Sequence, residues 1–204
     1  GRSGDPTVVP ALMALLSDPF YVLEAARALG RTGQEAAVPA LVGLLQRGND
    51  AVVRVAAVAL VEIHDAQVQR FGGARTVPSV LRSSSLEPHP TGRRLAHVIS
   101  GADAGEKTAV ARLLGWVGGA DAATGLLKLL DSQDLGVSRA SAAALGELGA
   151  EADAQILQAL REGDSSRRRA LLPLVGKRSA AVPDVLVCLE DRDATVRALS
   201  AETL

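Results

Sequence analysis

Short apolar segments and alanine-rich segments alternate along the chain. Segments such as 10–16 (PALMALL) and 39–45 (PALVGLL) are each followed by a polar turn and then by a stretch such as 23–30 (LEAARALG). Each apolar segment ends on a leucine or isoleucine, and these recur every 29 to 31 residues, except for one interval of 54: Leu16, Leu45, Ile99, Leu130, Leu160 and Leu189. Self-similarity at such a period predicts repeated helix pairs, with the apolar segment in the first helix and the alanine-rich segment in the second.

Three residue types mark the boundaries of the predicted helices. Proline is tolerated in the first turn of a helix. In three units a proline lies six residues before the leucine that ends the apolar segment: Pro10, Pro39 and Pro183. Aspartates in the turns are placed to cap the second helix: Asp18, Asp50, Asp134 and Asp193. Glycines occupy one equivalent position near the end of the second helix: Gly30, Gly115, Gly146 and Gly176. We expect these glycines to form left-handed caps.

Segment 38–60 (VPALVGLLQRGNDAVVRVAAVAL) resembles the HEAT-like repeat of the PBS-lyase type. The resemblance implies an all-α solenoid of the HEAT/armadillo kind, a right-handed stack of antiparallel helix pairs with the second helices on the concave side. We expect one domain over residues 1–204. Its predicted units are 5–33, 34–63, 91–118, 119–149, 150–179 and a truncated 180–204.

Residues 64–90 depart from the repeat pattern. They fit either a degenerate helix pair or an extended loop around a short helix at 77–84 (VPSVLRSS). The serines and the pair Pro88 and Pro90 predict a mobile, exposed stretch at the end of this insert.

Composition narrows the class of protein. Hydrophobic residues make up 48% of the chain but aromatic residues only 2%, which favours closely packed helices over sheets. The net charge of −1 gives no overall field that would attract nucleic acid or a membrane. A single cysteine, Cys188, and the absence of a long apolar run or a leader predict a cytoplasmic protein. The chain begins GRSG without Met and stops inside the repeat pattern, so we expect a fragment or a processed form.

No catalytic constellation stands out in the sequence. The three histidines, His64, His89 and His97, lack the spacing of metal ligands, and Cys188 falls at a position that is leucine in other units. There is no nucleophile elbow and no phosphate-binding glycine loop. We therefore expect a non-enzymatic protein without a metal or cofactor.

Arginines and aspartates recur around the turns of several units. In HEAT-type repeats such residues form a ladder of ion pairs between neighbouring units, and the resemblance implies a structural ladder here. The ladder residues are Asp50, Arg54, Asp134, Arg139, Asp164, Arg169, Asp191 and Arg197. A row of ligand-binding arginines is the alternative.

Two basic clusters stand out, one in segment 161–169 and one made of Arg70, Arg75, Arg82, Arg93 and Arg94. The candidate partner contacts in them are Arg167, Arg168, Arg93 and Arg94. They fit solvated faces or an acidic protein partner, and nucleic acid remains an alternative because arginines can contact phosphates. The near-neutral charge and the scarcity of aromatic residues argue against nucleic acid.

Trp116, the only tryptophan, occupies a position that is charged in other units: Arg31, Glu62, Glu147 and Lys177. It either packs on the insert 64–90 or anchors a partner, since tryptophan is enriched among residues that dominate binding energy. Phe20 and Tyr21, at the turn of the first unit, are further candidates for partner contact.

The function that these observations favour is a protein–protein interaction scaffold, binding a partner or another domain of a longer chain. Two alternatives stay open: a subunit of a lyase such as a bilin lyase, because such enzymes carry this repeat type, and a nucleic-acid-binding solenoid.

Overall fold

The computed structural model describes residues 8–84 and 90–204, and within them the chain is built from α-helices and short 3-10 helices without a strand. The first helices of the pairs are α1 (Val8–Leu15), α3 (Val38–Arg47), α6 (Pro90–Val98), α8 (Gly119–Leu130), α10 (Asp153–Glu162) and α12 (Val182–Cys188). The second helices are α2 (Val22–Thr32), α4 (Asp50–Phe71), α7 (Ala104–Val117), α9 (Leu135–Glu147), α11 (Ser165–Val175) and α13 (Ala194–Thr203). One further helix, α5 (Thr76–Ser84), lies between the second and third pairs.

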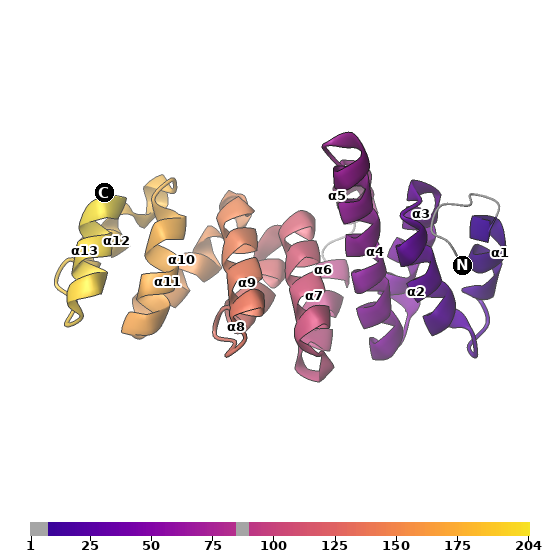
Figure 1. The fold of residues 1–204 in the computed structure, drawn as a ribbon. Coiled ribbons are helices and arrows are strands. Elements are labelled where there is room, and N and C mark those ends of the chain that lie inside the picture. The colour runs from indigo at the N-terminus through magenta and orange to yellow at the C-terminus, as the bar shows by residue number, and fades with distance from the viewer. Residues whose placement is uncertain (1–7, 85–89) are drawn as a thin grey trace.

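The helices form two rows, which confirms the predicted all-α solenoid. The second helices pack on one another in chain order from α2 to α13, and they form the front row in Figure 1. The first helices form a second row, in which α3 packs on α6, α6 on α8 and α8 on α10. Short 3-10 turns lead into several first helices: Glu35–Ala37, Ala150–Ala152 and Ser179–Ala181. A continuous core of leucine, valine and alanine runs along the stack.

Side-chain caps start most second helices, because the first amide hydrogens of a helix have no partner within it. Asp134 and Asp193 accept hydrogen bonds from the first turns of α9 and α13, as predicted. The prediction for Asp50 was wrong by one residue, since Asn49 caps α4 and Asp50 is its first residue. Asp18 instead accepts from the Phe20 amide in the turn before α2.

The repeated glycines are not left-handed caps, so that prediction was wrong. Gly30, Gly115 and Gly146 lie inside helices, and the glycines with positive φ are others, such as Gly33 at 64°. A Cβ on Gly30 would lie 2.8 Å from the Cα of Ala59, and one on Gly115 would lie 2.9 Å from the Cβ of Ala144. These glycines let neighbouring second helices approach closely.

The irregular insert forms an extension of α4 followed by the short helix α5. Helix α4 continues through His64, the first residue of the predicted insert, and stops at Gly72, where φ is 72°. Helix α5 packs on α3, α4 and α7 and buries Val77 and Leu81. The stretch around Pro88 lies outside the described residues. The α4–α5 pair therefore projects from one edge of the stack, at the top of Figure 1.

Candidate partner-binding pocket

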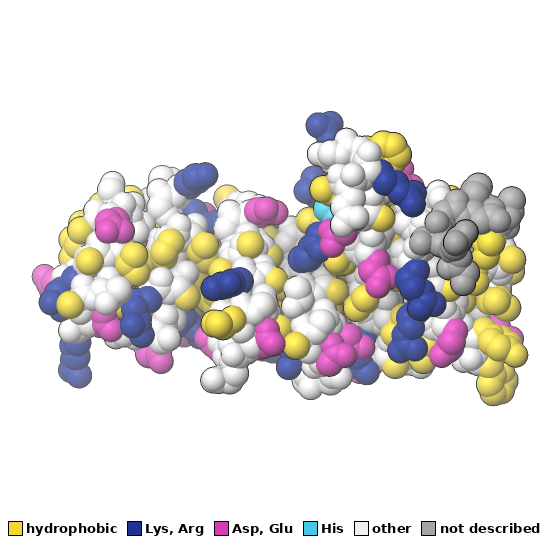
Figure 2. Space-filling view, in the orientation of Figure 1, with side chains coloured by type: hydrophobic (Ala, Val, Ile, Leu, Met, Phe, Trp, Pro, Cys, Tyr) yellow, Lys and Arg dark blue, Asp and Glu magenta, His cyan; other side chains and the backbone are white. Residues whose placement is uncertain are grey.

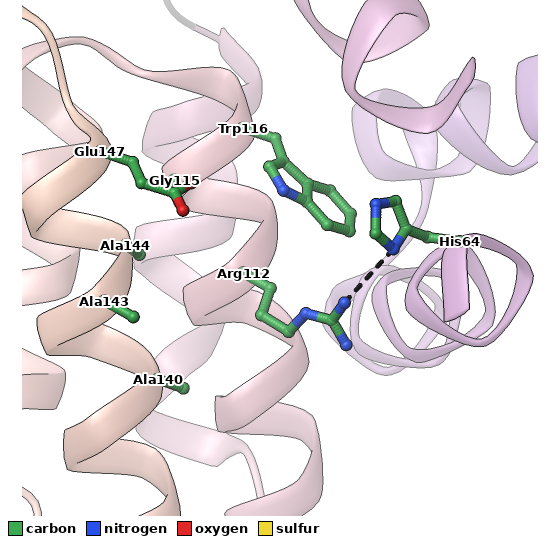
Figure 3. A pocket seen from close by; sticks show the side chains of 8 residues that line it. All are labelled: His64, Arg112, Gly115, Trp116, Ala140, Ala143, Ala144 and Glu147. Carbon is green, nitrogen blue, oxygen red and sulfur yellow. Dashed lines mark hydrogen bonds between the residues drawn. The ribbon is translucent and has the colours of Figure 1, made fainter. Parts of the chain in front are cut away.

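A pocket of about 450 Å³ opens on the second-helix face, between α4, α7 and α9. Figure 3 shows the side chains that line it: His64, Arg112, Gly115, Trp116, Ala140, Ala143, Ala144 and Glu147. The pocket exists because small residues line α9 where it faces α7, and no large side chain fills the space in front of them. Trp116, the only tryptophan of the chain, is one of the residues that line this pocket.

Trp116 is half-buried and packs against the first residue of the predicted insert. Its ring lies 4.5 Å from the His64 imidazole, centroid to centroid, with the two planes tilted by 33°. The guanidinium carbon of Arg112 lies 5.4 Å from the indole centroid, within the range of a cation–π interaction. On α5, Arg82 donates through Nε to the backbone oxygen of Trp116 at 3.3 Å. The indole therefore packs on the insert and also lines the pocket.

Asp65 holds Arg112 in this position. The guanidinium donates to both carboxylate oxygens, at 2.8 and 2.6 Å, and a pair with this geometry is stronger than a single charged hydrogen bond. The Nδ1 atom of His64 lies 3.3 Å from Asp65 Oδ1 and 3.3 Å from the nearer terminal nitrogen of Arg112. The hydrogen bond from Arg112 holds the pKa of Asp65 below its ordinary value, against the opposing effect of partial burial.

Glu147 lies on the other side of the indole from His64 in the view of Figure 3. Its carboxylate is exposed and forms no ion pair within the described parts of the chain. The pocket thus combines an indole, an apolar floor of alanines, an arginine neutralised by Asp65 and a free carboxylate. This is the mixture of a few polar groups and an apolar lining that side-chain-binding pockets present.

The other predicted partner-binding residues do not gather at this pocket. Phe20 is 88% exposed and Tyr21 is also exposed, in the turn between α1 and α2 at the far end of the stack. None of the four aromatic residues of the chain belongs to the buried core, which uses only aliphatic side chains and Cys188. The aromatic side chains are therefore placed where a partner can reach them.

Most arginines of the two predicted basic clusters have acidic partners within the chain. Arg94 donates to the Gly48 oxygen at 2.7 Å and lies 3.3 Å from an oxygen of Asp50. Arg93 is more exposed, with its Nε 3.4 Å from Asp121.

The cluster at the start of α11 is paired in the same way. Arg167 is bound to Asp131, and Arg168 lies 2.5 Å from Asp191. The four candidate contact arginines, Arg93, Arg94, Arg167 and Arg168, are thus all paired with carboxylates.

The predicted ladder is present only in part. Asp191 accepts from Arg168, from the Ser165 hydroxyl and from the Asp193 amide, and this last bond contributes most to the lowering of its pKa. The Arg54 Nε lies 3.2 Å from Glu106 of the next unit rather than from a turn aspartate.

The remaining ladder residues do not form the predicted ion pairs, except for one marginal contact of Arg169. Asp134 and Asp164 are helix caps, and Arg197 donates to the backbone oxygens of residues 191 and 192. Arg169 lies 3.9 Å from Asp193, at the limit of an ion pair. Arg139 is exposed and has no ion pair among the described residues, because its neighbour Asp134 is turned to the helix terminus.

Three features of the structure were not predicted from the sequence. His64 and Arg112 gave no signal, because their contact joins residues 48 apart through the irregular spacing of the insert. Arg178 is 9% exposed and binds Asp153 together with the backbone oxygens of Leu145 and Leu148 at the end of α9. Phe71, beside Gly72 and Gly73, is 75% exposed. A bulky residue next to paired glycines could have marked it.

The described residues hold no group of three or more histidine, cysteine, aspartate or glutamate side chains arranged to bind a metal ion. Within the same residues no helix is both long and apolar enough to cross a bilayer. Cys188 is buried, and this burial raises the pKa of its thiol.

The fold and the repeat period define a HEAT-type solenoid, and comparison with known proteins agrees. The family model described as HEAT repeats matches residues 1–62 and 93–175, well over half of the chain, and this protein belongs to that family. No curated protein matches the chain in sequence.

Solved structures show the same fold. One engineered protein is 21% identical, with 96% of this chain and 94% of that chain covered and a TM-score of 0.53. A second engineered protein is 19% identical, with 96% of each chain covered and a TM-score of 0.54. The complex of CpcE and CpcF of phycocyanin lyase from Nostoc sp. is 23% identical over 98% of this chain and 75% of that chain, with a TM-score of 0.45. The fold is shown by the two engineered proteins, and at identities this low their likeness describes the fold alone.

Proposed function

We propose that this protein is a non-enzymatic scaffold that binds a protein partner on its second-helix face, with one partner side chain inserted into the Trp116 pocket. The observation that carries the proposal is the pocket itself. It places a tryptophan, an alanine floor and a free carboxylate at the surface of a rigid stack. Tryptophan in a partly closed pocket is typical of the residues that dominate binding energy.

The surroundings of the pocket support a binding role. Arg112 and His64 are held by Asp65, so the indole is fixed in place before a partner arrives. A pre-ordered site loses less side-chain entropy when it binds. HEAT repeats generally mediate protein binding, and this family membership supports the same class of function.

Two features argue against the alternatives from the sequence. A nucleic-acid surface needs several free cations, but Arg94, Arg167 and Arg168 are held by carboxylates. A lyase subunit would need groups that handle a chromophore, and the residues of the pocket suggest none.

A displayed library of random linear peptides, selected on the wild-type protein, tests the proposal. Three variants then separate the pocket from the rest of the surface. Trp116→Ala removes the indole. Ala143→Gln fills the pocket from an exposed position on α9, and Ala154→Gln makes the same change at an exposed position on α10, in the other row. Glutamine is a good helix former, so both variants should fold.

Peptides enriched on the wild type should lose at least about 30-fold in affinity for Trp116→Ala and Ala143→Gln, as expected for a central anchor. They should bind Ala154→Gln as they bind the wild type. Failure to enrich any peptide, or enriched peptides that bind all three variants equally, would contradict the proposal.

A further inference from the structure

The projection formed by the end of α4 and the start of α5 is a second, separate surface. Helix α4 runs to Phe71, well beyond the core, and the chain turns back at Gly72 and Gly73 into α5. Residues 68–75, here called the α4–α5 tip, include the exposed side chains of Val68, Arg70, Phe71 and Arg75. Figure 2 shows basic and apolar side chains at the outer end of this projection.

The base of the tip is firmly attached to the stack. The buried side chain of Gln67 donates to the backbone oxygen of Gly33 at 2.6 Å, which fixes the last buried turn of α4. On the returning helix, Val77 and Leu81 are buried in the core. Thr76 donates to Glu35 Oε1 at 2.7 Å. The tip is therefore held at a defined position rather than on a long loop.

Positive charge is concentrated here, although the whole chain is close to neutral. Residues 66–84 contain Arg70, Arg75 and Arg82 and no acidic residue. Within the part of the chain that the structure describes, Arg70 and Arg75 form no ion pair. Among the described residues, Glu35 is the acidic residue that contacts this segment, through the hydrogen bond from Thr76. The tip thus presents two exposed guanidinium groups.

Phe71 lies between these two arginines in the sequence and is 75% exposed. Val68, one turn earlier on α4, is exposed as well, so the ring and the valine form a small apolar face. A Cβ built on Gly72 or Gly73 would meet no atom within 4 Å beyond the adjacent residues, so the turn next to Phe71 is open. Phenylalanine and arginine are both enriched at protein interfaces relative to the rest of the surface.

We propose that the α4–α5 tip binds an acidic segment of another protein, with carboxylates on Arg70 and Arg75 and an apolar side chain on Phe71. Guanidinium groups match carboxylates in geometry and can bind them with two hydrogen bonds. A polyanion such as nucleic acid gains affinity with each phosphate that is neutralised, and a convex tip with two free arginines neutralises few. A membrane would need more apolar surface than one ring and one valine.

Fluorescence anisotropy with defined probes tests the proposal. The probes are a labelled peptide of alternating Asp, Glu and Leu, the same peptide with Asn and Gln in place of the acids, a labelled single-stranded oligonucleotide, and phosphatidylcholine vesicles with phosphatidylserine. The variants are Phe71→Ala and the double change Arg70→Gln with Arg75→Gln. Matched controls are Phe20→Ala, the other exposed phenylalanine, and Arg139→Gln, an exposed arginine without an ion pair in the described structure.

The acidic peptide should bind the wild type, and rising salt should weaken it. The double arginine variant should lose about 10-fold or more in affinity and Phe71→Ala about 5-fold to 30-fold. Both controls should bind as the wild type does, and so should Trp116→Ala, because the tip does not depend on the pocket. Circular dichroism checks that every variant is folded.

Three results would overturn the proposal. The first is no binding of the acidic peptide at low salt. The second is equal binding of the acidic and amide peptides, or equal binding by the tip variants and the controls. The third is binding of the oligonucleotide or the vesicles, but not of the peptide, that depends on Arg70 and Arg75.

Discussion

Replacing Gly30 with alanine should destabilise the contact between α2 and α4, although alanine is the better helix former. A Cβ at this position would lie 2.8 Å from the Cα and 3.0 Å from the Cβ of Ala59, and it would also meet the Glu62 carboxylate. The glutamate side chain can turn away. The backbone at Ala59 cannot move unless the two second helices separate.

The magnitude follows from two opposing effects. Overpacking a closely packed interface costs about 1–3 kcal/mol. Removing a glycine from a helix returns about 0.5–1 kcal/mol. The net loss in the free energy of unfolding should therefore be about 1–2 kcal/mol for Gly30→Ala. At the equivalent Gly146, the nearest atom to a new Cβ is Leu174 Cδ2 at 3.7 Å, an ordinary contact. Gly146→Ala should therefore stabilise the protein by up to about 1 kcal/mol.

Urea unfolding followed by circular dichroism compares the two variants with the wild type. Neighbouring units of a solenoid unfold partly independently, so amide hydrogen exchange in α2 and α4 should accompany it. Exchange protection in these two helices should fall for Gly30→Ala. If Gly30→Ala stabilises the protein as much as Gly146→Ala does, the close approach of the second helices is not what these glycines provide.

Three further predictions concern side chains away from the glycines. Arg178→Ala should lower the free energy of unfolding by roughly 1.5–3 kcal/mol in urea titrations, because a nearly buried charged donor is lost. The control Arg139→Ala should change this free energy little, because Arg139 is exposed. Equal effects of the two substitutions would contradict the contacts of these arginines. The hydrogen bond from Arg112 lowers the pKa of Asp65 in the folded state below its ordinary value, so the ionised carboxylate stabilises the fold at higher pH. The stability advantage of the wild type over Asp65→Asn should therefore be constant near neutral pH and shrink as the pH falls from the ordinary carboxyl pKa through the lowered pKa of Asp65. An advantage that does not shrink in acid would refute the ion pair with Arg112. Cys188, buried and with a raised thiol pKa, should react with a thiol reagent only as the protein opens, and immediate labelling of the native chain would refute this burial.

The helix pairs could be predicted because each repeat unit is marked by residues at fixed, short spacings in the sequence. The leucines that end the apolar segments, the turn aspartates and the alanine-rich segments each act within one unit. The sequence pattern around Asp134 or Asp193 is therefore enough to predict a helix cap. The exception, Asp50, shows the limit of this reasoning, since the asparagine before it is an equally good cap.

Contacts between units were harder to predict. Gly30 was expected to end a helix, but its role depends on how near Ala59 lies in the next unit, which no local pattern records. Arg139 has the same spacing from its turn aspartate as Arg169, yet Arg169 lies 3.9 Å from Asp193 whereas Arg139 has no ion pair among the described residues. The packing of Trp116 on His64 depends on the extra turns of α4, and the irregular sequence of the insert gave no indication that α4 continues this far.

The indole N–H resonance of Trp116 tests the central claim most directly, because the chain has a single tryptophan and the resonance reports only on this pocket. A peptide selected on the wild type is titrated into the isotopically labelled protein. The account predicts that the indole resonance shifts with the affinity measured for the peptide, that Ala143→Gln abolishes the shift, and that Ala154→Gln leaves it unchanged. A peptide that binds with full affinity while the indole resonance stays in place would contradict the assignment of this pocket as the partner-binding site.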